Sequence, residues 1–214
     1  MDRDGYLAAW AHHHGGYDPM RNPLVRGWLS GTYVVARPLA DRHVPPDALT
    51  AAGVAASAAA ALLAALDARG WLLGAALVVV GSALLDSLDG AVALLTGRAT
   101  RWGYVLDSVC DRVGDLLHLL ALWLAGAHPA MCVAGGSLML LQEYTRARAG
   151  SAGMTEVGVV TVGERPTRVV VTAAFLAATA VLGQPWATLG AASWVGLGAV
   201  GLAQLLVVTR RRLR

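Results

Sequence analysis

Long apolar segments alternate with short polar ones along most of the chain. A helix needs about 20 apolar residues, at about 1.5 Å rise each, to cross a bilayer core about 30 Å thick. Six segments approach that length, roughly over residues 48–66, 71–95, 103–127, 129–145, 167–183 and 188–209. Because the breaks between them are short and contain turn residues, the pattern predicts an all-α protein with six transmembrane helices in one compact bundle.

A more mixed segment precedes the first apolar one. Residues 23–40 combine Trp28 and Tyr33 with arginines, which predicts a helix lying along the membrane interface; a plain linker is the alternative. Residues 1–22 lack the apolar stretch of a signal peptide, and we expect a mobile tail there. The histidines at 12–14 have no cysteine or carboxylate at metal-ligand spacing, so they receive no role. The predicted organisation is a tail over residues 1–22, one membrane domain over 23–209 and a basic tail over 210–214.

Composition agrees with a membrane protein and excludes several other classes. Hydrophobic residues make up 56% of the chain and charged residues 14%, against about 45–50% and about 25% in a typical soluble domain. Disordered chains have the opposite balance, and two cysteines are too few for a disulfide-stapled module.

The basic residues indicate the orientation, since all 17 of them are arginine. They gather before the first apolar segment, between the second and third, between the fourth and fifth, and at the end of the chain. The three loops on the other side hold only Arg69, so the positive-inside rule predicts that both termini face the cytoplasm from an inner membrane. The net charge of +3 therefore reflects sidedness rather than binding to nucleic acid.

Five aspartates fall within or at the cytoplasmic ends of the second and third apolar segments. A lipid-facing helix does not tolerate such residues, so they must face protein or water. Helical spacing places Asp86 and Asp89 on one face, and Asp107, Asp111 and Asp115 on another. The short link at residues 96–102 makes the two helices antiparallel neighbours, and we expect four or five of the carboxylates to share one pocket.

Positive charge is needed beside so many carboxylates, and Arg112 alone does not supply enough. Ligands that are all oxygens suit Mg²⁺ or Mn²⁺ better than zinc, and two such ions are expected here. A metal pair beside an arginine-rich surface suits the binding and displacement of a diphosphate. The alternatives are a structural polar network and a cation transporter, although transport sites usually lie near the membrane midplane between inverted repeats.

The aspartates resemble the signature of the CDP-alcohol phosphotransferase family, D-x-x-D-G-x-x-A-R-x8-G-x3-D-x3-D. The matching positions are Asp86, Asp89, Gly90, Ala93, Gly103, Asp107 and Asp111. This resemblance implies a six-helix membrane enzyme, generally a homodimer, with its active site near the cytoplasmic interface. The metal ligands that it implies are Asp86, Asp89, Asp107 and Asp111. Asp111 would also be the catalytic general base. The residues implied beside the cytidine nucleotide are Gly90, Ala93 and Gly103.

Within that family, further residues are most similar to actinobacterial phosphatidylinositol phosphate synthases. They are Pro46-Asp47 with Thr50, Cys110-Asp111-Arg112, the run from Tyr144 to Ala149, and Glu164-Arg165-Pro166. In those enzymes, basic residues of this region hold the phosphate of inositol phosphate. The resemblance implies that role for Arg146, Arg148, Arg165 and Arg168. Arginine forks bind phosphate oxygens well, whereas membrane sidedness alone is the other explanation for these residues.

The chain departs from the family pattern at two places. Leu94 stands where the signature has an arginine. If the helix continues for one more turn, Arg98 would lie beside the nucleotide in place of that arginine. Arg101 is a second candidate for this role. The last apolar segment, at residues 201–208, lacks the arginine that those synthases place there, so the acceptor is open to question.

We therefore expect a metal-dependent phosphatidyltransferase of phospholipid biosynthesis, which moves a phosphatidyl group from CDP-diacylglycerol to an alcohol with release of CMP. Inositol phosphate is the favoured acceptor, and glycerol 3-phosphate is the alternative. A catalytically silent homologue that binds CDP-lipid is a further alternative, suggested by Leu94.

Overall fold

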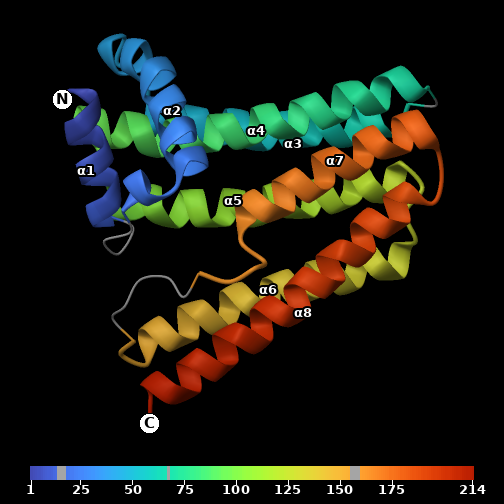
Figure 1. Cartoon of the computed structure of the whole chain (residues 1–214). Helices are drawn as coiled ribbons and strands as arrows, with labels where there is room; N and C mark the ends of the chain where they lie inside the picture. The colour runs from blue at the N-terminus through green and yellow to red at the C-terminus, as the bar shows by residue number, and fades with distance from the viewer. Residues whose placement is uncertain (14–17, 67, 155–159) are drawn as a thin grey trace. The chain divides into compact units, whose positions relative to one another are not determined.

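A computed structural model describes residues 1–13, 18–66, 68–154 and 160–214, and these residues form helices and no strands. The helices are α1 (Arg3–His13), the short 3-10 helix η1 (Pro19–Arg21), α2 (Pro23–Asp41), α3 (Pro46–Ala64), α4 (Arg69–Thr96), α5 (Arg101–Leu124), α6 (Pro129–Ser151), α7 (Arg165–Leu182) and α8 (Trp186–Arg212) (Figure 1). Each of the six apolar segments coincides with one of the helices from α3 to α8, which confirms the all-α prediction.

Within the described residues, four helices are long and apolar enough to cross a membrane, namely α3, α4, α7 and α8. Helices α5 and α6 have 24 and 23 residues, but they are more polar. In α5 four of the charged residues lie between Asp107 and Asp115, and in α6 Glu143, Arg146 and Arg148 interrupt the apolar sequence. The structure therefore gives four candidate membrane spans, and the count of six stays a prediction.

The chain forms two compact units, and α3, α4 and α5 each contribute to both. The first unit consists of Met1–Val54 and Ser82–Asp111. The second unit consists of Ala55–Gly81 and Arg112–Arg214.

An apolar core holds the first unit together. We refer to it as the N-terminal cluster, made of the buried residues Tyr6, Leu7, Leu29, Ala36, Leu49, Leu88, Ala91 and Val92. The cluster joins α1 and α2 to the first part of α3 and the second part of α4. Burial of these side chains is the main stabilising contribution in this unit, at about 25 cal/mol per Å² of apolar surface removed from water.

Helix α1 lies where the sequence predicted a mobile tail. Tyr6 is 1% exposed and stacks near Tyr33 of α2, with 5.6 Å between the ring centroids. The Met1 carbonyl accepts hydrogen bonds from the Tyr33 hydroxyl and from Arg37. Burial raises the pKa of Tyr6 to about 12. The sequence did not reveal this helix because its few apolar residues gain stability only against partners from other helices. His12 is exposed, whereas the side chain of His13 and all of His14 lie outside the described residues.

Helix α2 begins at a sequence-encoded cap. The Asn22 side chain accepts hydrogen bonds from the backbone N–H groups of Leu24 and Val25, and Pro23 occupies the first helical position. One face buries Leu29 and Ala36, while other apolar side chains, such as Leu24 at 83% exposure, point outward. This confirms the predicted helix; its position along a membrane interface stays a prediction.

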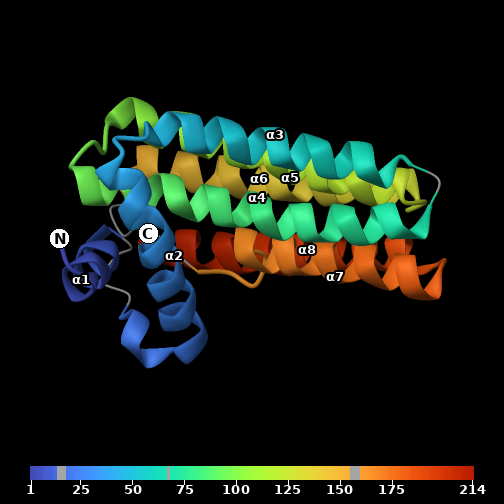
Figure 2. The same ribbon diagram turned by 90° about the horizontal axis from the view of Figure 1, so that it is seen from above.

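Helix α8 packs against both α6 and α7 in the second unit, and α6 and α8 run side by side in Figures 1 and 2. Glycines allow this close approach. A Cβ atom at Gly198 would lie 2.9 Å from Leu138 Cβ, and one at Gly190 would lie 2.7 Å from Phe175 Cβ. Small residues are the usual means by which helices approach closely in membranes.

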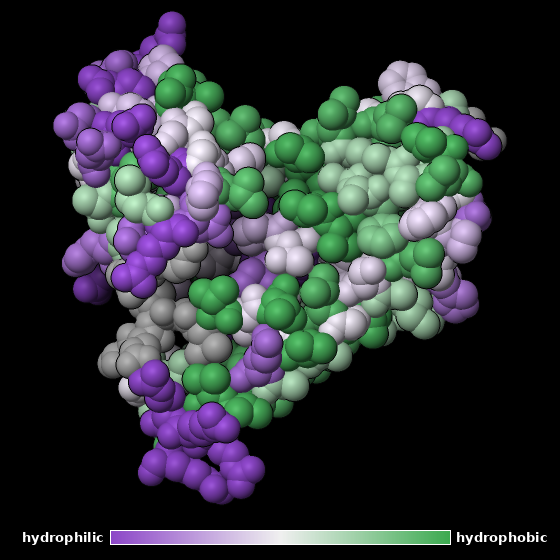
Figure 3. All heavy atoms as spheres, viewed as in Figure 1, coloured by the Kyte–Doolittle hydropathy of each residue, from purple (hydrophilic) through white to green (hydrophobic). Residues whose placement is uncertain are grey.

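Apolar side chains also cover the outside of the second unit's helices. Val133, Val170 and Val181 are each at least 64% exposed on α6 and α7. Figure 3 shows hydrophobic atoms along α8 and hydrophilic ones at its C-terminal end, where Arg210, Arg211 and Arg212 form the last turn. Exposed apolar surface along helices of this length is what a lipid environment requires.

Candidate active site

Three aspartates of the first unit lie close together. Asp86 comes from α4, and Asp107 and Asp111 come from α5, one helical turn apart. One carboxylate oxygen from each lies within 4.8 Å of the other two, and all three side chains are partly buried. The structure thus brings together three of the four predicted metal ligands, and we call them the aspartate trio.

Asp89, the fourth predicted ligand, lies in the same unit but is not a member of the trio. It is 6% exposed, and its Oδ2 accepts a hydrogen bond of 2.5 Å from the Thr50 hydroxyl of α3. Its Oδ1 accepts one from the Gly90 N–H. Two hydrogen bonds to the charged form stabilise this carboxylate in one orientation. Thr50 therefore contributes to the orientation of Asp89.

Asp115 corrects the expectation that up to five carboxylates share one pocket. It belongs to the second unit, is completely buried, and lies 2.8 Å from Nη2 of Arg168 on α7. Arg112 Nε is 3.6 Å from the same carboxylate oxygen. The helical spacing correctly placed Asp115 on the stripe of Asp111, but it carried no information about the arginine opposite.

The donor set of the trio fits a hard divalent cation. Its ligand atoms are all carboxylate oxygens, which Mg²⁺ and Mn²⁺ prefer, and no imidazole or thiolate belongs to the group. Partial burial strengthens the attraction between such a cation and the three negative charges. The residues present therefore suit a Mg²⁺ or Mn²⁺ ion.

The small residues predicted beside the nucleotide also lie in the first unit. A Cβ atom at Gly90 would meet nothing within 4 Å, and Gly90 is exposed, so this side of α4 is open. Ala93 follows on the next turn and is partly buried. The Gly103 N–H donates to Thr100 Oγ1 at the start of α5, where a Cβ would come within 3.1 Å of that oxygen.

Arg98 does not extend α4 as expected. The helix ends at Thr96, and Gly97 adopts a left-handed conformation with φ of 66°. The Arg98 N–H then bonds back to the Ala93 carbonyl, which is a common way for a glycine to terminate a helix. The premise that would place Arg98 one helical turn beyond Leu94 is therefore wrong.

Leu94 itself has an apolar environment. It is partly buried and packs against the N-terminal cluster. The side chain at this signature position thus contributes to the packing of α4 in the first unit.

Buried and half-buried charges of the second unit form a balanced network. Arg112 Nη1 lies 2.7 Å from Glu143 Oε1, and Arg146 Nη2 lies 2.8 Å from Glu164 Oε1. Together with the pair of Arg168 and Asp115, three arginines thus face three carboxylates. Such a network neutralises its own charges and ties α5, α6 and α7 together.

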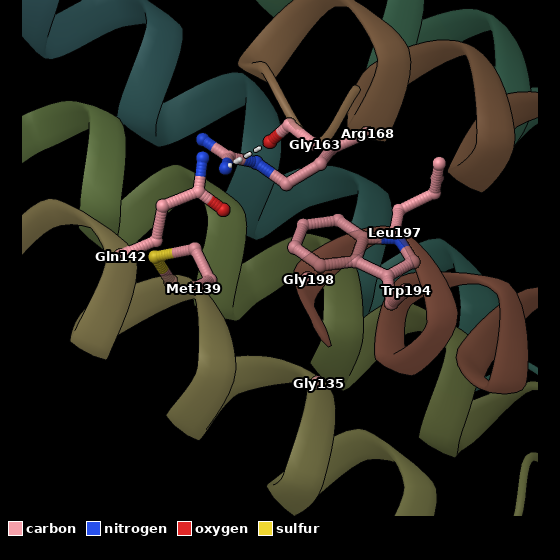
Figure 4. A pocket seen from close by; sticks show the side chains of 8 residues that line it. All are labelled: Gly135, Met139, Gln142, Gly163, Arg168, Trp194, Leu197 and Gly198. Atoms are coloured by element: carbon pink, nitrogen blue, oxygen red, sulfur yellow. Dashed lines mark hydrogen bonds between the residues drawn. The ribbon is translucent and has the colours of Figure 1, made fainter. Parts of the chain in front are cut away.

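Arg168 is the most enclosed arginine of the network. Its side chain is 4% exposed, and its Nη1 donates a hydrogen bond of 2.7 Å to the Gly163 carbonyl. The guanidinium carbon lies 5.8 Å from the ring centroid of Trp194. Figure 4 shows this arrangement beside Gln142, around a cavity too small to admit a sugar phosphate.

The four arginines predicted to bind the acceptor phosphate therefore have different environments, all within the second unit. Arg146 and Arg168 are in ion pairs with carboxylates. Arg148 is exposed, near the end of α6. Arg165 is partly buried at the first position of α7, and its guanidinium lies beside Gly114.

Glu164 anchors the turn that precedes α7. Burial raises the pKa of Glu164, but the hydrogen bonds from Arg146 and from Thr161, together with the charge of Arg146, lower it below its usual value. Its Oε1 accepts from both the N–H and the hydroxyl of Thr161. The sequence had marked Glu164 only through family resemblance, and it had not indicated Thr161.

Polar residues in the middle of apolar helices also have partners in the second unit. His118 lies 3.3 Å from the Ser57 hydroxyl, with both residues completely buried. Gln142 donates to Thr161 Oγ1, and Gln204 of α8 accepts from the Val162 N–H. Sequence analysis did not identify Gln204 because the segment around it is apolar. The only feature that could have indicated it was a single amide side chain among aliphatic neighbours.

Comparison of the sequence with known protein families identifies the family of this chain. A family model described as CDP-alcohol phosphatidyltransferase matches residues 43–207, which is most of the chain. The chain belongs to the CDP-alcohol phosphatidyltransferase family.

Named relatives narrow the similarity further. The phosphatidylinositol phosphate synthase of Mycobacteroides abscessus is 35% identical over 173 residues, covering 78% of this chain and 74% of that protein. That of Mycobacterium marinum is 37% identical over 157 residues, covering 70% of this chain and 61% of that protein. The archaetidylinositol phosphate synthase of Aeropyrum pernix is 44% identical over 78 residues, covering 36% of this chain and 40% of that protein. The chain thus spans less than two thirds of the length of the latter two relatives.

A solved structure has the same fold. The crystal structure of Mycobacterium tuberculosis phosphatidylinositol phosphate synthase with CDP-DAG bound is similar, with a TM-score of 0.68 and 28% sequence identity. The similarity covers 83% of this chain and 92% of that one. With the four apolar helices, the family indicates an integral membrane protein.

Proposed function

We propose that the protein transfers the phosphatidyl group of CDP-diacylglycerol to inositol phosphate and releases CMP, as a step of phospholipid biosynthesis. The observation that carries this proposal is the aspartate trio of Asp86, Asp107 and Asp111, whose carboxylate oxygens lie within 4.8 Å of one another. The names of the synthases from M. abscessus and M. marinum support inositol phosphate as the acceptor. The CDP-DAG in the M. tuberculosis structure supports the donor.

The reaction is a displacement at the phosphorus that bears the diacylglycerol. The acceptor hydroxyl oxygen forms a bond to this phosphorus, and the bond from phosphorus to the oxygen of CMP breaks. Asp111 accepts the hydroxyl proton as the general base. The aspartates of the site would hold divalent cations, whose positive charge would offset the negative charge that develops on the leaving CMP.

The ligands that we propose for two such ions are Asp86, Asp89, Asp107 and Asp111. The trio provides three of them directly, and Thr50 holds Asp89 in a fixed orientation through the 2.5 Å hydrogen bond. Residues that orient metal ligands commonly affect metal affinity 10–100-fold. The open side of α4 at Gly90 leaves space for the cytidine part of the donor.

The acceptor phosphate is proposed to bind to Arg148 and Arg165. Both belong to the predicted set: Arg148 is exposed near the end of α6, and Arg165 begins α7. Arg146 and Arg168, by contrast, face Glu164 and Asp115 at 2.8 Å. A phosphate next to the paired arginines would compete with these carboxylates. Arg146 and Arg168 are accordingly proposed to support the site rather than to bind the anion themselves.

The membrane arrangement that we propose has six spans, α3 to α8, with both termini and the active site on the cytoplasmic side. Five of the arginines before α3 and four at the chain end support this orientation. Arg112 of α5 and Glu143 of α6 pair with each other inside the second unit, which reduces the cost of placing them in a membrane. The family resemblance supports a homodimer.

CMP release by the detergent-purified protein tests the proposal. CDP-diacylglycerol and Mg²⁺ or Mn²⁺ are supplied with inositol phosphate, glycerol 3-phosphate, inositol, serine or no acceptor. We expect release with inositol phosphate, loss of release in Asp111→Asn with nucleotide binding retained, and full activity in the control Asp41→Asn. Asp41 is an exposed carboxylate at the end of α2. Weaker Mn²⁺ binding by Asp86→Asn, measured by electron paramagnetic resonance, tests the metal site independently of turnover.

The other outcomes identify the alternatives. CMP release that requires glycerol 3-phosphate would show that glycerol 3-phosphate, and not inositol phosphate, is the acceptor. Metal-dependent CDP binding without release would indicate a silent homologue, an alternative favoured by the apolar packing of Leu94. Metal binding without any CDP binding would refute the phosphatidyltransferase proposal.

A further inference from the structure

The turn that leads into α7 is held by side chains from three helices of the second unit. Gln142 of α6 donates a 2.8 Å hydrogen bond from Nε2 to Thr161 Oγ1. Gln204 of α8 accepts a 3.1 Å hydrogen bond at Oε1 from the Val162 N–H. Arg168 of α7 donates to the Gly163 carbonyl. Residues 161–163, which we call the α7 turn, are thus fixed at each position.

The backbone of α8 also supports the α7 turn directly. A Cβ atom at Gly163 would lie 2.9 Å from the Leu197 carbonyl oxygen, so only a glycine permits this approach. Gln204 is located two helical turns beyond Leu197 on α8 and binds the neighbouring residue of the turn. Together the two contacts determine how the turn lies on this helix.

The α7 turn in turn determines where the acceptor arginines lie. Glu164 follows it directly, accepts from Thr161 and holds Arg146 at 2.8 Å. Arg165 comes next and begins α7. A shift of the turn would therefore move Arg165, a proposed phosphate ligand, together with Glu164, the carboxylate that orients Arg146.

We propose that Gln204 is a positioning residue for the acceptor: through the Val162 N–H it fixes the α7 turn, and with it Arg165 and Glu164, in the geometry that binds the acceptor phosphate. Gln142 secures the same turn from α6. This inference rests on the proposed function, since the arginines that it concerns are the proposed acceptor ligands. Gln204 is exposed and belongs to the second unit, whereas the aspartate trio belongs to the first.

Steady-state kinetics with separate titrations of donor and acceptor test the proposal. Gln204→Met keeps the length of the side chain but removes the oxygen that accepts the hydrogen bond. We expect the KM for inositol phosphate to rise about five-fold, the equivalent of one hydrogen bond of about 1 kcal/mol. The KM for CDP-diacylglycerol and the Mn²⁺ affinity should not change. Gln204→Glu retains an acceptor oxygen and should restore the KM to within about two-fold of wild type.

Ser193→Ala is the matched control on the same helix. Its hydroxyl donates to the Leu189 carbonyl within α8, and we expect wild-type kinetics. A second measurement does not depend on turnover: the rise in Tm caused by inositol phosphate should be smaller in Gln204→Met than in wild type, while the rise caused by CDP should be equal.

The results distinguish failure of this inference from failure of the proposed function. An unchanged acceptor KM in Gln204→Met, or an equal loss for donor and acceptor, would overturn the positioning role while the wild-type activity stands. Loss of acceptor affinity that Gln204→Glu does not restore would also overturn it. Absence of acceptor-dependent CMP release and of inositol phosphate binding in wild type would refute the proposed function, and this inference with it.

Discussion

Removal of the Asp115 carboxylate should destabilise the protein strongly. Asp115 is completely buried and lies 2.8 Å from Arg168, whose side chain is 4% exposed. Asp115→Asn keeps the shape but leaves Arg168 with the Gly163 carbonyl and with Glu143 at 4.0 Å. Breaking a buried ion pair from one side typically costs about 3–5 kcal/mol, because the remaining charge is uncompensated. For a chain of this size, that is a decrease in Tm of roughly 6–20 °C.

The assay is thermal unfolding of the detergent-purified protein, with Asp41→Asn as the control. Asp41 and Arg37 form an exposed pair at 3.8 Å with 69% and 51% of their side chains exposed, so its loss should cost at most about 1 kcal/mol. The double variant Asp115→Asn with Arg168→Gln should lose less stability than the sum of the losses in the two single variants. Equal Tm changes in Asp115→Asn and Asp41→Asn would refute the reasoning, and so would full additivity in the double variant.

Three further results are expected. Leu94→Arg should lower Tm, because it places a charge against the N-terminal cluster at a cost of about 1–3 kcal/mol in the free energy of unfolding. The same substitution should lower the KM for CDP-diacylglycerol. An unchanged donor KM would show that the missing arginine is irrelevant to nucleotide binding. Thr50→Val should weaken Mn²⁺ binding by about 10-fold or more because Asp89 loses its orienting hydrogen bond, and unchanged metal titrations would contradict this role. The pKa of Glu164 is lowered in the folded state, so its contribution to stability is present above the unfolded-state pKa and is lost as the pH falls through the folded-state value. Tm measured from pH 7 downward should therefore fall less in Glu164→Gln than in wild type, and equal slopes would count against the Arg146 contact.

The sequence was sufficient to predict the long helices and the proximity of the three aspartates of the trio. Apolar length determines where α3, α4, α7 and α8 lie, and helical spacing correctly placed Asp107 and Asp111 on one face. The antiparallel arrangement of the two acidic helices then brought Asp86 to them. These features depend on local periodicity, which a sequence displays directly.

Features that depend on partners distant in the chain were not predictable in this way. Helix α1 is stabilised by apolar side chains from α2, α3 and α4, so its own short pattern resembled a tail. Asp115 shared a helical stripe with Asp111, but the residue opposite it is Arg168, which is 53 positions away in sequence. Arg98 was misplaced for a local reason instead, because Gly97 ends α4 with a left-handed conformation.

The pairing of Asp115 with Arg168 has an evolutionary consequence. A substitution at either position alone would leave a buried, uncompensated charge, so natural homologues that lose one partner should also have lost the other. The exposed pair of Arg37 and Asp41 imposes no such linkage, and its two positions should vary independently. Correlated substitution of the two partners among homologues would therefore distinguish buried ion pairs that stabilise the second unit from ion pairs on the surface.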